Sequence, residues 1–430
     1  MDAHGALRPL APWVADRPLK LMVGDIGARM TVLRLRDGGL VPALAGADRR
    51  VARRRAGTRR SRTVRRHVRL PLVSRAVKPS DLLRPTVRAV APYVPGEQPG
   101  AGRRVIKLNT NENPYPPSPR VLEALRTAVD ETVRLYPDPE ARALRARASS
   151  VYGVPADHIL AGNGSDELLA LLLRATVDAG DRVAFPVPTY SLYETLVAVQ
   201  GGEAIRPEFA GDWTLPPSLA ACDARVTFLC NPNSPSGTVV AREVIEALAR
   251  DVSGVLVVDE AYVDFADGDA LALVGRLHNV LVLRTLSKSF SLAGLRCGIA
   301  FGHPDLLAGL RTVKDSYNLN RLTQVAAEAA LGDLPHMLAN VARIRATRAR
   351  LASALAELGY VVPPSHANFV LARRPGADQA AVAAALAARG VLVRHFAAPR
   401  LQDALRITVG TDEESDALLH RLTAILRSDM

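Results

Sequence analysis

The chain of 430 residues has little cysteine, little lysine and no long uninterrupted apolar run. The spacing of Cys222, Cys230 and Cys297 does not match that of metal ligands, and an odd number of thiols cannot all pair, so we expect reduced thiols in a cytoplasmic protein and no bound metal. No apolar stretch approaches the length of a membrane-spanning helix, and no signal-peptide core follows the first residues. These absences argue against a disulfide-stabilised secreted domain and against a membrane partner.

Negative charge is scarce only at the start of the chain, and this explains the formal net charge of +12. Residues 1–77 contain 18 Lys and Arg against 5 Asp and Glu, whereas residues 78–430 contain 37 against 38. The arginine-rich run 49–69 has no regular period and too few apolar residues to fold alone. We therefore predict a basic, disordered and dispensable extension over residues 1–77. The alternatives are a targeting segment or an arm that contacts nucleic acid or an anionic membrane; we expect at most nonspecific contact with nucleic acid.

With 48% hydrophobic residues, the sequence can bury one large core or two smaller ones. The pattern of residues 78–430 predicts an α/β fold. Short apolar strands are expected at 182–185, 225–229, 255–258, 280–283 and 297–301, and amphipathic helices at 166–175, 189–200 and 241–251. Continuous apolar strands between helices indicate a mostly parallel sheet covered on both faces. After about residue 304 the chain is helical through 357, and strands at 367–372, 391–395 and 405–409 with helices at 376–389 and 412–426 then predict a smaller α+β domain. The predicted segments are an N-terminal arm or linker (78–112), a large domain (113–310) and a small C-terminal domain (311–430).

Lys288 is one of only five lysines, whereas the chain has 50 arginines. Arginine cannot replace an amine that must lose its proton to attack a carbonyl, because guanidinium stays protonated. Lys288 follows the predicted strand 280–283, and Asp259 follows the preceding predicted strand, 255–258. Ligands of open α/β sheets bind at the carboxyl ends of strands, so both side chains are expected in one crevice. Taken alone, each has a simpler interpretation: a surface lysine, and a carboxylate that caps a helix.

A tight turn, Gly162-Asn-Gly-Ser165-Asp166, runs directly into an apolar helix, with Ser165 or Asp166 as the expected N-cap. The amides at such a helix start bind phosphate. Arg296, eight residues after Lys288, is a candidate second phosphate ligand, and Tyr190 offers a flat ring after strand 182–185. An amine, a carboxylate, a phosphate cradle, an arginine and an aromatic ring together match the requirements of pyridoxal phosphate.

The segment Thr285-Leu-Ser-Lys288-Ser-Phe-Ser-Leu-Ala-Gly-Leu-Arg296, with Asp259-Glu-Ala-Tyr262 upstream, resembles the fold-type I pyridoxal-phosphate aminotransferases. Within that group the chain is most similar to the histidinol-phosphate aminotransferases. The similarity covers roughly residues 80–430 and is carried by Asn111-Glu-Asn-Pro-Tyr115, Leu135-Tyr136-Pro-Asp138, Gly164-Ser-Asp-Glu167, Pro188-Thr-Tyr190 and Leu405-Arg-Ile-Thr-Val-Gly-Thr411.

The resemblance implies a role for each matching residue. Lys288 would be the Schiff-base lysine and proton carrier, Asp259 would pair with the pyridine nitrogen and Tyr262 with the ring hydroxyl. Around the cofactor, Ser165, Asp166, Ser287 and Arg296 would hold the phosphate, Tyr190 would stack on the ring, and Tyr136 would reach the phosphate in the other subunit of a homodimer. Tyr115, Arg394 and Arg406 would contact substrate. The family's usual Asn-Pro-Thr-Gly is here Ser234-Pro-Ser-Gly237, so the partner of the ring oxygen is Ser234, a shifted Asn233, or Tyr262 alone.

The implied activity is amino-group transfer between L-histidinol phosphate and 2-oxoglutarate, in L-histidine biosynthesis. An aromatic amino acid aminotransferase and a phosphothreonine-type decarboxylase use the same scaffold and are alternatives within the enzyme class. A transcription regulator with an aminotransferase-like sensor is an alternative from another class. Residues 1–77 disfavour it, because they are basic but show no helix-turn-helix pattern.

Overall fold

The structure is a computed structural model that describes residues 31–34, 40–43, 78–91, 96–99 and 105–428. The chain divides into two compact units, Met1–Arg75 and Ala76–Met430. In the first unit, strands β1 (Thr31–Arg34) and β2 (Leu40–Ala43) pair antiparallel. Apart from these strands, the extension that we predicted to be disordered lies outside the described residues.

Within the described part of the second unit, a seven-stranded sheet has the order β4-β10-β9-β8-β7-β5-β6. Neighbouring strands run parallel except β10, which is antiparallel to both β4 and β9. Strands β8 and β9 are direct neighbours, so their carboxyl ends lie side by side. The bounds are β4 Ile159–Gly162, β5 Arg182–Ala184, β6 Glu203–Ile205, β7 Val226–Cys230, β8 Val255–Asp259, β9 Val280–Thr285 and β10 Gly298–Phe301.

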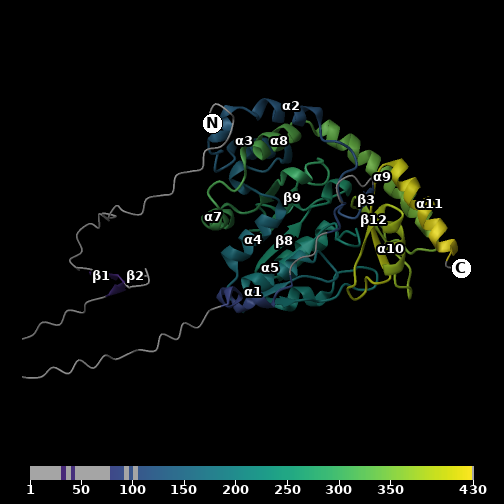
Figure 1. Cartoon of the computed structure of the whole chain (residues 1–430), viewed down its shortest axis with the longest axis horizontal. Helices are drawn as coiled ribbons and strands as arrows, with labels where there is room; N and C mark the ends of the chain where they lie inside the picture. Colours follow the sequence, from purple (N-terminus) through teal and green to yellow (C-terminus); the bar gives the residue numbers. More distant parts are fainter. Residues whose placement is uncertain (1–30, 35–39, 44–77, 92–95, 100–104, 429–430) are drawn as a thin grey trace, which may run out of the picture. The chain divides into compact units, whose positions relative to one another are not determined.

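Helices cover both faces of this sheet (Figure 1). Along β8 the side chains alternate: Val257 packs on the face covered by α4, α5 and α7, whereas Leu256 and Val258 pack on the face covered by α3, α6 and α8. Strands buried on both faces need continuous apolar sequence, which is the pattern that β7, β8 and β9 show. The helices are α1 Pro85–Ala89, α2 Pro119–Ala128, α3 Arg142–Tyr152, α4 Ser165–Thr176, α5 Leu192–Gln200, α6 Arg242–Asp251, α7 Pro304–Val313, α8 Arg321–Leu331 and α9 Leu334–Glu357.

A second, four-stranded sheet has the order β11-β13-β12-β3 within residues 105–428. Its strands are β11 (Phe369–Arg373), β12 (Val391–His395), β13 (Ala404–Thr408) and β3 (Ile106–Leu108), with helices α10 (Ala380–Ala388) and α11 (Asp412–Ser428) beside it. Strand β3 lies in the segment that we expected to be an arm or linker, yet it pairs parallel with β12, whose residues come 285 positions later in the chain. The segment that follows β3 therefore starts at the second sheet.

The predicted fold class is confirmed: a mostly parallel sheet covered by helices, with a smaller α+β part. Two strands of the large sheet were not predicted: β4, which runs straight into the glycine turn, and β6, which is short and partly exposed. The antiparallel direction of β10 was not predicted either. The boundaries proposed at residues 112 and 310 stay predictions.

Candidate active site

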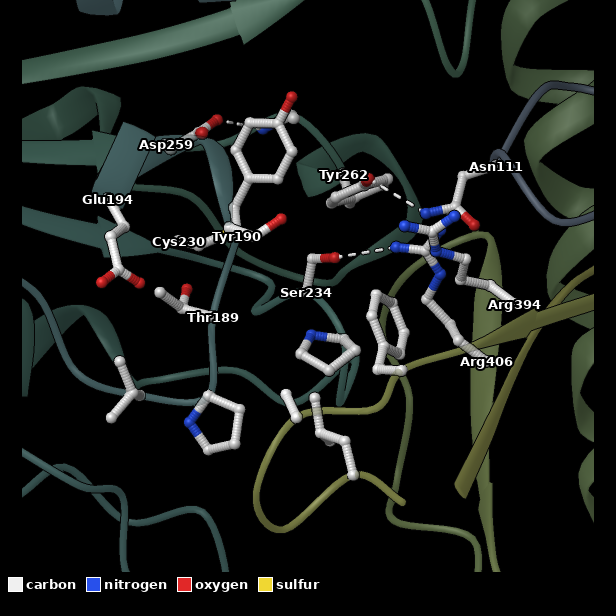
Figure 2. A pocket seen from close by; sticks show the side chains of 18 of the residues that line it. Asn111, Thr189, Tyr190, Glu194, Cys230, Ser234, Asp259, Tyr262, Arg394 and Arg406 are labelled. Carbon is white, nitrogen blue, oxygen red and sulfur yellow. Dashed lines mark hydrogen bonds between the residues drawn. The ribbon is translucent and has the colours of Figure 1, made fainter. Parts of the chain in front are cut away.

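A cavity of about 480 Å³ lies where β5, β7, β8 and β9 end, between the two sheets (Figure 2). Arg394 and Arg406 enter it from β12 and β13, and Asn109, Thr110 and Asn111 form another part of the wall. Strand ends of this kind are the usual ligand sites of α/β sheets. Of the predicted site residues, those that line the cavity are Ser165, Asp166, Tyr190, Asp259, Tyr262, Ser287, Lys288, Arg296, Arg394 and Arg406.

Lys288 lies three residues beyond the end of β9. Its Nζ donates to the carbonyl oxygen of Thr110 at 3.3 Å, and the side-chain amide of Asn113 donates to the Lys288 carbonyl at 3.1 Å. Burial, followed by the charge of Arg406, lowers the pKa of Lys288 to about 8, although Glu112 and Asp166 act in the opposite direction. At neutral pH about a tenth of such amines is uncharged, several-hundredfold more than for an ordinary lysine.

Asp259, the last residue of β8, is a buried carboxylate at the floor of the cavity. Its Oδ2 accepts a hydrogen bond from the Tyr193 hydroxyl at 2.7 Å, and its Oδ1 accepts one from the Ala261 amide at 3.2 Å. Burial raises the pKa of Asp259 to about 6, and the bond from Tyr193 lowers it in part. A buried carboxylate in a cavity wall is stabilised by a cationic partner, so this floor favours a protonated ring nitrogen.

The start of α4 has amide groups that its own side chains do not cap. We expected Ser165 or Asp166 to be the N-cap, and this was wrong: the N-cap is Gly164, at φ +83°, and the helix begins at Ser165. The positive φ favours glycine at this position, and a Cβ there would displace the guanidinium of Arg296 from the helix start. With no side chain over them, the first amides of α4 can bind an anion.

Arg296 brings a positive charge to the same helix start. Its Nη2 lies 3.2 Å from Asp166 Oδ2, and its Nη1 donates to Ser287 Oγ at 3.3 Å. The start of α4 lies close against β10 only because residue 298 is a glycine: a Cβ there would lie 2.5 Å from the Ser165 amide nitrogen. Helix amides, two serine hydroxyls and a guanidinium therefore form one compact site for a dianion.

Two tyrosines from different elements complete the walls. Tyr190, just before α5, donates from its hydroxyl to Asp166 Oδ1 at 3.2 Å, and its ring meets the Tyr193 ring edge to face. Tyr262 lines the cavity beyond the end of β8, and its hydroxyl oxygen accepts a hydrogen bond from the Asn111 amide at 3.1 Å (Figure 2). Burial raises the pKa of Tyr262 to about 12, so this phenol keeps its proton at neutral pH.

The turn after β7 directs Asn233 and Ser234 to different partners. The Asn233 side chain accepts from the Thr189 hydroxyl at 2.8 Å and donates to Ser236 Oγ at 3.0 Å. Ser234 instead lines the cavity, where its hydroxyl accepts from Arg406 Nη1 at 3.2 Å (Figure 2). The amide of Asn233 is thus engaged within its own neighbourhood, and Ser234 is the residue of this pair that faces the site.

Two residues that position the site, Tyr193 and Asn111, were not predicted from the sequence. Tyr193 follows Tyr190 by three residues, a helical spacing that could have placed both rings on one side, but no pattern identified Asp259 as its partner. Asn111 was quoted only as part of a motif. Its partner Thr408 is 297 residues away, so local sequence could not link them.

The model of the family "aminotransferase class I and II" matches residues 103–422. Histidinol-phosphate aminotransferase 1 of Trichormus variabilis is 46% identical over 349 residues, which cover 81% of this chain and 100% of that protein. The chain belongs to the histidinol-phosphate aminotransferase family. The histidinol-phosphate aminotransferase of Geotalea uraniireducens is likewise 46% identical over 343 residues, covering 80% and 99% of the two chains. The crystal structure of the Sinorhizobium meliloti histidinol-phosphate aminotransferase in complex with pyridoxal-5'-phosphate superposes with a TM-score of 0.75 at 29% identity, covering 81% and 98%.

These histidinol-phosphate aminotransferases form a family of pyridoxal-phosphate-dependent transferases, so the chain is an aminotransferase. Three of its predicted site residues, Asn233, Tyr115 and Tyr136, do not line the cavity. Tyr115 is buried beneath the guanidinium of Arg343, 3.6 Å from the ring centre, whereas Tyr136 is 79% exposed. None of the helices in the described residues of this aminotransferase is both long and apolar enough to span a bilayer.

Proposed function

We infer that the chain is a pyridoxal-phosphate-dependent histidinol-phosphate transaminase that moves an amino group between L-histidinol phosphate and 2-oxoglutarate, in L-histidine biosynthesis. One observation carries the proposal: the amine of Lys288, the buried Asp259 carboxylate and the α4 amides with Arg296 all line one cavity. The names of the relatives support the substrate. The buried free thiols of Cys222, Cys230 and Cys297 are compatible with a cytoplasmic location.

The residues present fit pyridoxal phosphate. The α4 amides, Ser287 and Arg296 would hold its phosphate, and the room they need is kept by Gly164 and Gly298. When bound, the group supplies a carbonyl that condenses with amines and a ring that accepts electrons. Asp259 would face the ring nitrogen and keep it protonated, because a buried carboxylate gains most from a cationic neighbour.

Lys288 can both bind the cofactor and carry a proton. Its Nζ must be uncharged to attack a carbonyl, and must then accept and release a proton beside the substrate. A pKa of about 8 allows both forms near neutral pH. Asn113 holds the backbone of the lysine through its bonds to the carbonyls of Lys288 and Ser289, which keeps the amine at the strand end.

Arg394 and Arg406 give the substrate side of the cavity its positive charge. They are directly opposite each other on β12 and β13, so their guanidinium groups reach the cavity from one sheet face. Two adjacent cations suit the phosphate of histidinol phosphate or a carboxylate of 2-oxoglutarate. Ser234 accepts a hydrogen bond from Arg406 and so helps to hold it in place.

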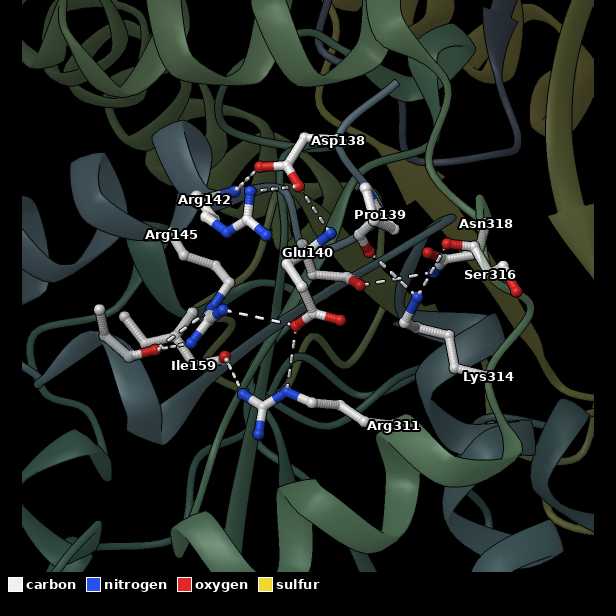
Figure 3. A network of polar contacts seen from close by, with 12 residues as sticks. Asp138, Pro139, Glu140, Arg142, Arg145, Ile159, Arg311, Lys314, Ser316 and Asn318 are labelled. Carbon is white, nitrogen blue, oxygen red and sulfur yellow. Dashed lines mark hydrogen bonds and ion pairs between the residues drawn. The ribbon is translucent and has the colours of Figure 1, made fainter. Parts of the chain in front are cut away.

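A homodimer is part of the proposal because Tyr136 faces solvent. Its ring stacks on Tyr317 with centres 4.2 Å apart, and Tyr317 is also exposed. A polar network holds the loop that carries Tyr136 (Figure 3). Lys314 donates a hydrogen bond to the Pro139 carbonyl at 3.1 Å, and Glu140 forms ion pairs with Arg145 and Arg311. A rigid, outward-pointing aromatic pair is a surface that a second copy of the chain would cover.

The test combines cofactor attachment with substrate preference. Borohydride reduction of the loaded protein should attach pyridoxal phosphate to Lys288, as located by peptide mass spectrometry. Lys288→Ala should lose this label and turnover, whereas Lys78→Ala, at an exposed position, should keep both. Full activity of Lys288→Ala would refute the mechanism. A higher kcat/KM for phenylalanine than for histidinol phosphate would favour an aromatic amino acid aminotransferase instead.

A further inference from the structure

Asn111 connects the second sheet to the cavity through bonds that the proposed function does not use. It is fully buried, and its backbone has φ +58°, a conformation that asparagine and aspartate tolerate better than most side chains. On one side it contacts Thr408 of β13. On the other side it contacts the hydroxyl of Tyr262 (Figure 2). The Asn368 amide also donates to its carbonyl at 2.9 Å.

The hydrogen bonds around Asn111 form one consistent series of donors and acceptors. The Asn111 N–H can only donate, and it donates to Thr408 Oγ1 at 3.0 Å. The Thr408 hydroxyl then donates its own hydrogen to Asn111 Oδ1, also at 3.0 Å. With Oδ1 turned to Thr408, the Nδ2 group must face Tyr262, where it donates at 3.1 Å.

The phenol oxygen of Tyr262 is therefore an acceptor towards Asn111, and its hydrogen must point elsewhere. Tyr262 lines the cavity, so the side away from Asn111 is the ligand side. We propose that Asn111 is a positioning residue that sets the polarity of the Tyr262 hydroxyl, so that Tyr262 donates a hydrogen bond to a ligand oxygen in the cavity. This rests on the proposed function, in which the ligand oxygen is the ring hydroxyl oxygen of pyridoxal phosphate.

Asn111→Asp reverses this polarity with little change in shape. Aspartate keeps the acceptor for Thr408 and tolerates the same backbone conformation, but it presents an oxygen to Tyr262. The phenol would then donate to the introduced carboxylate instead of to the ligand. Because a hydrogen bond to an ionised oxygen is among the stronger ones, its loss should weaken pyridoxal phosphate binding about tenfold.

Two quantities should be measured on the apoprotein loaded with pyridoxal phosphate: the dissociation constant and the pH at which the absorbance of the bound cofactor changes. Losing a donor to the ring oxygen disfavours its deprotonated form, so Asn111→Asp should move that transition upwards by about one pH unit. Tyr262→Phe should act in the same direction. In the Tyr262→Phe background, Asn111→Asp should add less than about twofold, since its effect passes through the missing hydroxyl.

Asn368→Ala is the matched control: it removes the bond from the Asn368 side chain to the Asn111 backbone carbonyl but leaves the bond from Asn111 to Tyr262, and it should stay within about twofold of the wild-type dissociation constant. Thr408→Val, which removes the hydroxyl that orients the amide, should weaken binding even if Asn111→Asp does not fold. An equally large effect of Asn111→Asp in both backgrounds, or none in either, would overturn the proposal. A wild-type chain that binds no pyridoxal phosphate would overturn the proposed function as well.

Discussion

The low pKa of Lys288 depends on neighbours of opposite sign, and this allows a paired test. Arg406 lowers the pKa and Glu112 raises it, so Arg406→Met and Glu112→Gln should shift it in opposite directions. Glu112 is itself held by an ion pair with Lys107 and by a hydrogen bond from the Thr110 hydroxyl. The Thr110 carbonyl in turn accepts the hydrogen bond from Lys288 Nζ. Both variants thus change one charge and leave the lysine in place.

The size of the expected change follows from the order of the causes. The pKa of Lys288 falls from the ordinary lysine value of 10.5 to about 8, and burial contributes more to this fall than Arg406 does. Arg406→Met should therefore raise the pKa of Lys288 part of the way from about 8 back towards 10.5. A rise of about one unit would lower the uncharged fraction at pH 7 from about a tenth to about a hundredth. Glu112→Gln should take the pKa below 8 and raise that fraction.

The rate at which the apoenzyme captures pyridoxal phosphate, followed by stopped-flow absorbance from about pH 6 to about 9, reports the uncharged amine. The ratio of each variant to wild type at every pH removes the ionisations of the cofactor itself. Capture by Arg406→Met should be slower near neutral pH and recover at high pH, and capture by Glu112→Gln should be faster. Shifts of the same sign in both variants would refute the electrostatic account.

Three further outcomes are expected. Gly298→Ala should raise the dissociation constant of pyridoxal phosphate at least tenfold, because its Cβ would press on the Ser165 amide, whereas Gly294→Ala, with open space around it, should not. Between about pH 3.8 and 6 the folded apoenzyme binds a proton at Asp259 that the unfolded chain releases, so the free energy of unfolding should fall as the pH rises through this window. Asp259→Asn should remove this pH dependence in urea titrations, and an unchanged dependence would contradict the raised pKa of Asp259. If Tyr136 completes the site of the other subunit, Tyr136→Ala and Lys288→Ala should each be inactive alone. Mixing the two variants should then restore up to about a quarter of the wild-type activity, because half of the dimers are mixed and each has one intact site. No recovery on mixing would argue against a shared site.

The residues that sequence could place are those that follow strands. Asp259 and Lys288 stand directly beyond apolar runs, and strand ends of a parallel sheet must share an edge, so their meeting in one cavity could be inferred without a structure. The glycine turn before α4 was visible from its two glycines and from the apolar helix that follows it. Its N-cap was not, because Gly164 lies against Arg296, more than a hundred residues away.

Residues whose role depends on packing could not be placed. The choice between Asn233 and Ser234 depends on Thr189 and Arg406, which reach the turn from other elements. Asn111 acquires its partners only when β13 and the segment after β8 come together. Sequence periodicity describes each element alone, and these bonds exist between elements.

Strand β3 has a mechanical consequence. It is hydrogen-bonded into the second sheet, and the residues that follow it are bonded to the lysine loop through Asn113 and to Tyr262 through Asn111. Rotation of the second sheet against the first would therefore have its pivot in the wall of the cavity itself. Any such closing movement would pull on the lysine loop and on the Tyr262 hydroxyl together, so the arginines of β12 and β13 could not move across the cavity without also shifting Lys288 and Tyr262.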